Sequence, residues 1–132
     1  FFEALKAEKK DLRALAGLKI AVLGSGTAKA LESYGLYPDL MPEIFEGEAL
    51  GKALAEKLSG GERILIPRAA LGGAELIEEL EKKGVTVDDI PTYDTLYETP
   101  GAVDEKAEFD TGTVDYAVFT SASTVRGFAQ AL

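Results

Sequence analysis

The sequence predicts an α/β fold with three layers, in which helices cover both faces of a five-stranded, parallel, doubly wound sheet. Three observations lead to this prediction. Short, nearly continuous apolar runs recur at 18–23, 63–67 and 114–119, as expected for strands buried on both faces. Amphipathic stretches with helical spacing lie between these runs. Glycines follow most of those stretches and mark the ends of the helices. Strands that alternate with helices in this way are joined by crossovers and form a parallel sheet.

The first half of the chain is predicted to begin with a helix and then to alternate strands with helices. In chain order we expect a helix over 1–15, a strand over 18–23, a helix that starts after 24–27 and stops at Gly35, a strand over 39–41 and a helix over 47–58. Prolines flank the segment 39–41, which places this strand at a sheet edge, because proline cannot donate to a ladder.

The second half is predicted to continue the same alternation. In chain order we expect a strand over 63–67, a helix over 73–83, an extended segment over 85–97, a strand over 114–119 and a final helix that starts after 120–123. The helix over 73–83 has the clearest pattern, because glutamates stand four residues before lysines on it and Gly84 follows it. Residues 104–111 are ambiguous and fit one helical turn.

Composition excludes several kinds of chemistry. The 132 residues contain no cysteine and no histidine, which removes disulfides, thiolate catalysis, sulfur-ligated metals and the usual general base at neutral pH. Any reaction must use tyrosine, carboxylates, lysine or arginine, hydroxyls or backbone amides. The formal net charge of −9 argues against nucleic acid and anionic membranes as partners. No apolar run approaches the roughly 20 residues of a membrane span, so a cytoplasmic domain is expected.

Four segments follow predicted strands at their carboxyl ends, which is where parallel sheets bind ligands. In the first segment, glycines allow the backbone to approach a ligand, and the start of a helix offers free N–H groups to an anion. The residues concerned are Ser25, Gly26, Thr27 and Ala28. The dinucleotide fingerprint and the phosphate-binding P-loop both need residues that are absent here. The alternative is a tight turn in which Ser25 or Thr27 caps the helix.

The second and third segments contribute one cation and one phenol. Arg68 follows the strand over 63–67 and suits a carboxylate or a phosphate, while the alternative is a surface arginine paired with a local carboxylate. Tyr93 lies on the same side of an extended chain as Thr95 and Tyr97. Its hydroxyl could donate or relay a proton in a chain without histidine. The alternative for Tyr93 is an aromatic side chain that covers the sheet edge.

The fourth segment, over 120–124, carries four hydroxyls in five residues before the final helix. Ser121, Ser123 and Thr124 could hold a carboxylate, and the alternative is a plain helix cap. Ser123 has no general base near it in the sequence, so a nucleophile is not expected there. Together the four segments predict a metal-free site that binds an anionic small molecule and directs a reactive substrate by orientation and hydrogen bonds.

Several short motifs keep a common order and spacing from about residue 18 to residue 128. They are IAVLGSGTA over 20–28 with Leu31 and Gly35, Pro42-Glu43, LIPR over 65–68, Gly84-Val85 with Val87, YDT over 93–95 and VDYAVFTSASTV over 114–125. This ordered set resembles the uroporphyrinogen-III synthase family, and specifically one of the two similar α/β domains of that family.

The resemblance implies an activity and a domain assignment. The family's enzymes are hydro-lyases that cyclise hydroxymethylbilane to uroporphyrinogen III in tetrapyrrole biosynthesis, with loss of water, inversion of the last pyrrole ring and no cofactor. A cytoplasmic monomer of two domains is expected, with the second domain inserted in the first. Residues 1–16 would be the helix that enters from a missing first domain. Residues 17–132 would be the inserted domain, ending in the helix that returns, and the isolated piece is expected to be inactive.

The resemblance also implies roles for individual residues. Tyr93 would assist departure of the substrate hydroxyl. Carboxylate arms of the substrate would be bound by Ser25, Gly26, Thr27, Ala28, Arg68, Ser121, Ser123 and Thr124. The net charge of −9 conflicts with an anionic substrate, so further cations are expected from the missing domain.

The residues leave one alternative function open. A non-catalytic or flavin-phosphate-binding flavodoxin-like domain remains compatible with the pattern, because residues 24–27 could cradle a phosphate. A phospho-receiver is disfavoured, since Gly24-Ser25 and Pro67-Arg68 stand where such a domain needs acidic residues.

Overall fold

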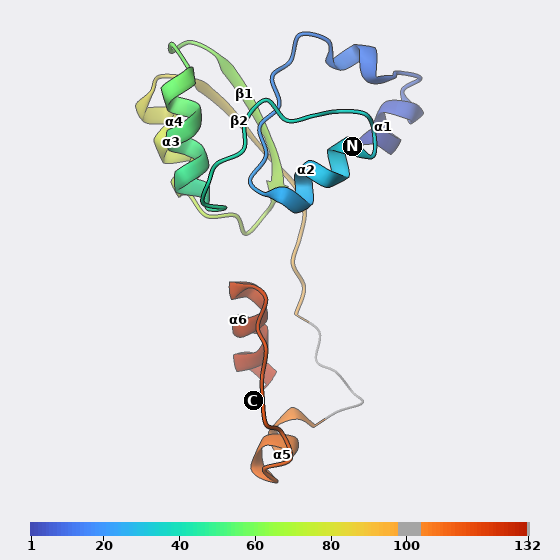
Figure 1. Cartoon of the computed structure of the whole chain (residues 1–132), viewed down its shortest axis with the longest axis vertical. Coiled ribbons are helices and arrows are strands. Elements are labelled where there is room, and N and C mark those ends of the chain that lie inside the picture. The colour runs from blue at the N-terminus through green and yellow to red at the C-terminus, as the bar shows by residue number, and fades with distance from the viewer. Residues whose placement is uncertain (98–103, 132) are drawn as a thin grey trace. The chain divides into compact units, whose positions relative to one another are not determined.

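The computed structural model describes residues 1–97 and 104–131 (Figure 1). In chain order the elements are α1 (Phe2–Ala7), the 3₁₀ turn η1 (Leu12–Leu15), α2 (Ser25–Glu32), α3 (Gly47–Lys57), β1 (Arg63–Ala69), α4 (Glu75–Lys82), β2 (Thr86–Tyr93), α5 (Glu105–Asp110) and α6 (Ala122–Ala131). They fall into two compact units, Phe1–Thr92 and Tyr93–Leu132.

The strands β1 and β2 are neighbours in a sheet and run parallel, with α4 as the connection between them. Near their starts, the Thr86 N–H donates to the Glu62 carbonyl at 2.8 Å. Near their ends, the Thr92 hydroxyl donates to the Arg68 carbonyl at 3.2 Å. Because starts pair with starts and ends with ends, the predicted strand–helix–strand crossover over this part of the chain is confirmed.

The two earlier predicted strands lie side by side but do not form regular strands. Ala21 and Leu40 make an isolated parallel bridge, and the Val22 N–H donates to the Leu40 carbonyl at 3.0 Å. The Asp39 side chain accepts the Ile20 N–H at 2.9 Å, in the position where a strand would offer a backbone carbonyl. A side chain that takes the ladder's hydrogen bond, with prolines on both sides of it, explains why the pairing stops at one bridge.

The sheet therefore differs from the expected five strands. Two strands are present in the described residues, and the predicted strand over 114–119 carries no ladder. Tyr116 and Val118 are 89% and 84% exposed there. The unit Tyr93–Leu132 holds no neighbouring strand in its described residues to pair with this segment, and a strand without a partner has no hydrogen-bonding ladder. Burial on both faces is also not seen in β1, where Leu65 is 55% exposed.

The first predicted helix is broken into two short pieces. α1 ends where Lys9 takes a left-handed backbone with φ of 55°. A new turn then starts at Asp11, whose carboxylate accepts the Arg13 N–H at 3.0 Å. This local cap competes with a continuous helix over 1–15. The other predicted helices are confirmed to within a few residues at their ends, and α5 lies in the stretch that was ambiguous.

The main helix–helix contact of Phe1–Thr92 joins α3 to α4, which lie side by side (Figure 1). A Cβ placed on Gly51 of α3 would stand 2.7 Å from the Glu79 Cβ and 3.2 Å from the Leu76 carbonyl oxygen of α4. This close approach accompanies the burial of Leu80, which has no exposed surface, and of Leu50, which is 6% exposed. Gly51 is therefore required by packing.

Gly51→Ala is expected to lower the free energy of unfolding by about 1–3 kcal/mol, because the added methyl group overpacks the contact between α3 and α4. The higher helix propensity of alanine offsets at most about 1 kcal/mol of that loss. Urea denaturation followed by circular dichroism measures the change. Gly26→Ala is the matched control, since nothing lies within 4 Å of its Cβ position, and it should leave stability unchanged or raise it. Equal stability of Gly51→Ala and wild type would contradict the packing.

Candidate functional site

The start of α2 leaves its first backbone N–H groups without a side-chain cap. Gly24 precedes the helix with an extended backbone, and no side chain hydrogen-bonds to this helix start within the described residues. The cap considered for Ser25 or Thr27 is therefore not formed. Ser25, Gly26 and Thr27 are exposed, while Ala28 is 7% exposed and packs inward. The first N–H groups of such a helix face outward and have no partner in the preceding turn.

An aromatic ring lies against this helix start. A Cβ on Gly24 would stand 3.3 Å from Cγ and Cδ2 of Phe45, so the ring sits directly over the glycine backbone. Phe45 is nevertheless 53% exposed. Any larger residue at position 24 would have to displace this ring. Gly24 thus makes room for the Phe45 ring.

Arg68 is held by a carboxylate and a carbonyl of its own unit. Its Nε and Nη2 donate to the two carboxylate oxygens of Asp89, each at 2.8 Å, and its Nη1 donates to the Gly73 carbonyl. The hydrogen bond from Arg68 lowers the pKa of Asp89 and raises that of the guanidinium. The surface ion pair considered for Arg68 is thus formed, and it joins β1, β2 and the turn before α4. Its role towards a substrate stays a prediction.

Tyr93 is the last residue of β2 and is 63% exposed. At this exposure the ring is not buried against the sheet edge, which the alternative role of Tyr93 would require. It does not line the hollow described below. The proposed role of its hydroxyl therefore stays a prediction, with exposure as the supporting observation.

The predicted hydroxyl cluster gathers at the start of α6. The Thr124 N–H donates to the Ser121 hydroxyl at 3.3 Å, and the Thr124 hydroxyl donates to the Ser121 carbonyl at 2.7 Å. The hydroxyls of Ser121 and Ser123 are 2.9 Å apart. Ser121 thus caps the helix, which is the alternative considered from the sequence. A cap and a ligand site are compatible, since Ser123 and Thr124 also line a hollow.

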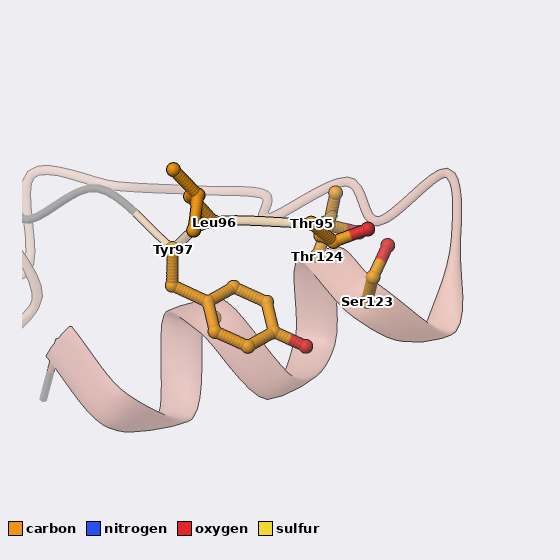
Figure 2. A pocket seen from close by; sticks show the side chains of 6 residues that line it. Thr95, Leu96, Tyr97, Ser123 and Thr124 are labelled. Carbon is orange, nitrogen blue, oxygen red and sulfur yellow. The ribbon is translucent and has the colours of Figure 1, made fainter. Parts of the chain in front are cut away.

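A hollow of about 200 Å³ lies beside the first turns of α6 (Figure 2). Its lining residues are Thr95, Leu96, Tyr97, Ser123, Thr124 and Gly127. Of the predicted site residues, Ser123 and Thr124 line this hollow, together with Tyr97, which was not among them. The sequence placed Tyr97 on the side of Thr95 by alternation but gave it no role. The signal for this packing was a glycine inside a helical pattern, at Gly127.

Over residues 1–97 and 104–131, no group of three or more aspartates or glutamates is placed to hold a metal ion. None of the helices described for the same residues has the length and apolar character needed to cross a bilayer.

Comparison with known proteins gives one consistent family. The family model described as uroporphyrinogen-III synthase HemD matches residues 1–132. A porphyrin biosynthesis protein HemD of Ruminiclostridium josui is 39% identical over 128 residues, which are 97% of this chain and 25% of that protein. A uroporphyrinogen-III synthase of Synechococcus elongatus is 32% identical over 112 residues, which are 84% of this chain and 42% of that protein.

A solved structure gives the same fold. The crystal structure of uroporphyrinogen III synthase from Thermus thermophilus matches with a TM-score of 0.60 at 24% identity. The match covers 98% of this chain and 50% of that one. The chain thus spans between a quarter and a half of the length of these relatives.

Asp89→Asn is expected to destabilise the unit Phe1–Thr92 at pH 7, because it removes the charged partner of Arg68. The folded pKa of Asp89 lies below its ordinary value, so the pair stabilises the fold above about pH 4 and loses this effect as pH falls through the folded pKa. The urea midpoints of variant and wild type should therefore converge as pH falls below the folded pKa of Asp89. Asp94→Asn, at an exposed position outside this pair, is the control. A difference that stays constant with pH would contradict the ion pair.

Proposed function

The chain belongs to the uroporphyrinogen-III synthase family, and we propose that it is the inserted second domain of an enzyme that cyclises hydroxymethylbilane to uroporphyrinogen III. The observation that carries the proposal is the family match along all 132 residues, together with relatives of which the chain spans only a quarter to a half. The enzyme would be a cytoplasmic monomer that acts in tetrapyrrole biosynthesis.

The proposal includes a domain assignment. Residues 1–16, which hold α1 and η1, are the segment through which the chain enters from the first domain, and residues 17–132 are the inserted domain. The complete domain would have the five-stranded, doubly wound, flavodoxin-like sheet. Support comes from the parallel pairing of β1 with β2 and from the parallel bridge between Ala21 and Leu40.

The proposed reaction requires the protein to transfer a proton and to position the substrate. The hydroxyl of the terminal hydroxymethyl group leaves as water once its oxygen accepts a proton, and the pyrrole nitrogen stabilises the carbocation that remains on the methylene carbon. In the proposal, the exposed hydroxyl of Tyr93 supplies or relays that proton. The chain's other groups hold and fold a substrate that is already reactive, which is a task of orientation rather than of nucleophilic attack by the protein.

The carboxylate arms of the substrate need hydrogen-bond donors. In the proposal, the N–H groups at the start of α2 and the hydroxyls at the start of α6 bind these carboxylates. Arg68 is a further donor, which releases the Asp89 carboxylate and binds a substrate carboxylate in its place. Backbone N–H groups supply donors without adding formal charge to a chain whose net charge is −9. The partner domain supplies the additional cations.

The activity is tested with hydroxymethylbilane as substrate and a separation of uroporphyrinogen III from uroporphyrinogen I. We expect the chain alone to fold but to form the III isomer with little or no activity, because half of the proposed cleft belongs to the other domain. The enzyme containing both domains is the control and should form the III isomer. Activity of the chain alone near that of the two-domain enzyme would contradict the domain assignment. Bound flavin in the purified chain would support the flavodoxin-like alternative instead.

Tyr93→Phe in the two-domain enzyme is expected to lower kcat about 100-fold, the usual size of a general acid contribution. Its melting temperature should change little, because the side chain is 63% exposed. Tyr116→Phe, at an 89% exposed tyrosine, is the matched control and should keep the wild-type rate. An unchanged rate for Tyr93→Phe would contradict the proposed proton transfer by its hydroxyl.

A further inference from the structure

Tyr97 is held against α6 by a contact that only glycine allows. A Cβ on Gly127 would stand 2.8 Å from Cδ1 and 3.3 Å from Cε1 of the Tyr97 ring. The first distance is shorter than a Cβ contact can be, so the ring lies directly on the helix backbone. Tyr97 is 37% exposed in this position. The phenol is therefore fixed by packing on one side and open to solvent on the other.

The fixed ring brings its hydroxyl to a wall of the hollow beside α6. Figure 2 shows the ring lying along the helix, with the hydroxyl pointing towards the end of α6 that carries Ser123 and Thr124. Leu96 completes the apolar part of the lining and is 83% exposed. The hollow is thus lined by four hydroxyl-bearing side chains and one apolar side chain.

The size and lining of the hollow select a small ligand group. Its volume of about 200 Å³ is below the roughly 300–1,000 Å³ of a pocket for a whole drug-sized ligand. The Tyr97 and Ser123 hydroxyls can donate hydrogen bonds to a carboxylate, whereas the Thr124 hydroxyl already donates to the Ser121 carbonyl. The apolar side chain suits the methylene groups that carry the carboxylate. An acetate or propionate arm has both parts.

On the basis of the proposed function, we propose that Tyr97 is a further substrate-binding residue, which with Ser123 holds one carboxylate arm of the linear tetrapyrrole in the hollow. Tyr97 donates its phenol proton to the carboxylate as a hydrogen bond and keeps it. This role differs from that of Tyr93, which acts on the departing hydroxyl. Gly127 has a positioning role, because it sets the place of the Tyr97 ring.

Tyr97→Phe in the two-domain enzyme tests the proposal with hydroxymethylbilane as substrate. KM should rise about tenfold with kcat within about twofold of wild type, because a lost hydrogen bond to a charged group weakens ground-state and transition-state binding alike. The melting temperature should not change, since the ring and its contact with Gly127 remain. Tyr116→Phe is the control and should keep the wild-type KM. An unchanged KM for Tyr97→Phe overturns the proposal.

Gly127→Ala tests the placement of the ring independently. The added methyl group displaces the ring, so KM should rise as it does for Tyr97→Phe. In a Tyr97→Ala background the same change should have no further effect on KM, because no ring remains to be displaced. Additive effects of the two changes would overturn the positioning role of Gly127. If the unmodified two-domain enzyme forms no uroporphyrinogen III, the proposed function itself fails, which is a separate result.

Discussion

The close approach of α3 and α4 at Gly51 is the contact on which the unit Phe1–Thr92 depends. Without a side chain at position 51, the backbone of α3 comes within van der Waals distance of Glu79 on α4. This approach accompanies the complete burial of Leu80. Because α4 connects β1 to β2, its position on α3 also sets where the carboxyl end of β1 and the turn before α4 lie.

The ion pair between Arg68 and Asp89 lies at this carboxyl end of the sheet. The guanidinium reaches Asp89 on the next strand and the Gly73 carbonyl in the turn, so one side chain connects three segments at the carboxyl end of the sheet. A bidentate pair of this kind is both strong and specific in geometry. It gives Arg68 a structural role at an edge where a substrate carboxylate would have to compete with Asp89.

The two candidate donor sets are the N–H groups at the start of α2 and the hydroxyls at the start of α6. They differ in how many of their donors already have a hydrogen-bond partner within the protein. At the start of α2 the first N–H groups have no side-chain cap within the described residues. At the start of α6, Ser121 and Thr124 are engaged in capping, and Ser123 shares a hydrogen bond with Ser121. A phenol fixed beside the second set adds a donor that the cap does not consume. In the proposed carboxylate site, the Tyr97 phenol is the donor that capping leaves available.

The sequence by itself determined the helices α2, α3, α4 and α6, the crossover through α4, the family and the hydroxyl-rich start of α6. Local signals suffice for the helices and their ends, since helical periodicity, glycine stops and caps act within a few residues. Only the tertiary structure decided that Arg68 pairs with Asp89, that the segment over 18–23 makes one bridge and that Tyr97 lies on Gly127. Those outcomes depend on partners far along the chain, 21 residues away in the case of Arg68. The order of elements predicts which strand ends share an edge, but it does not specify which distant side chain each residue will contact.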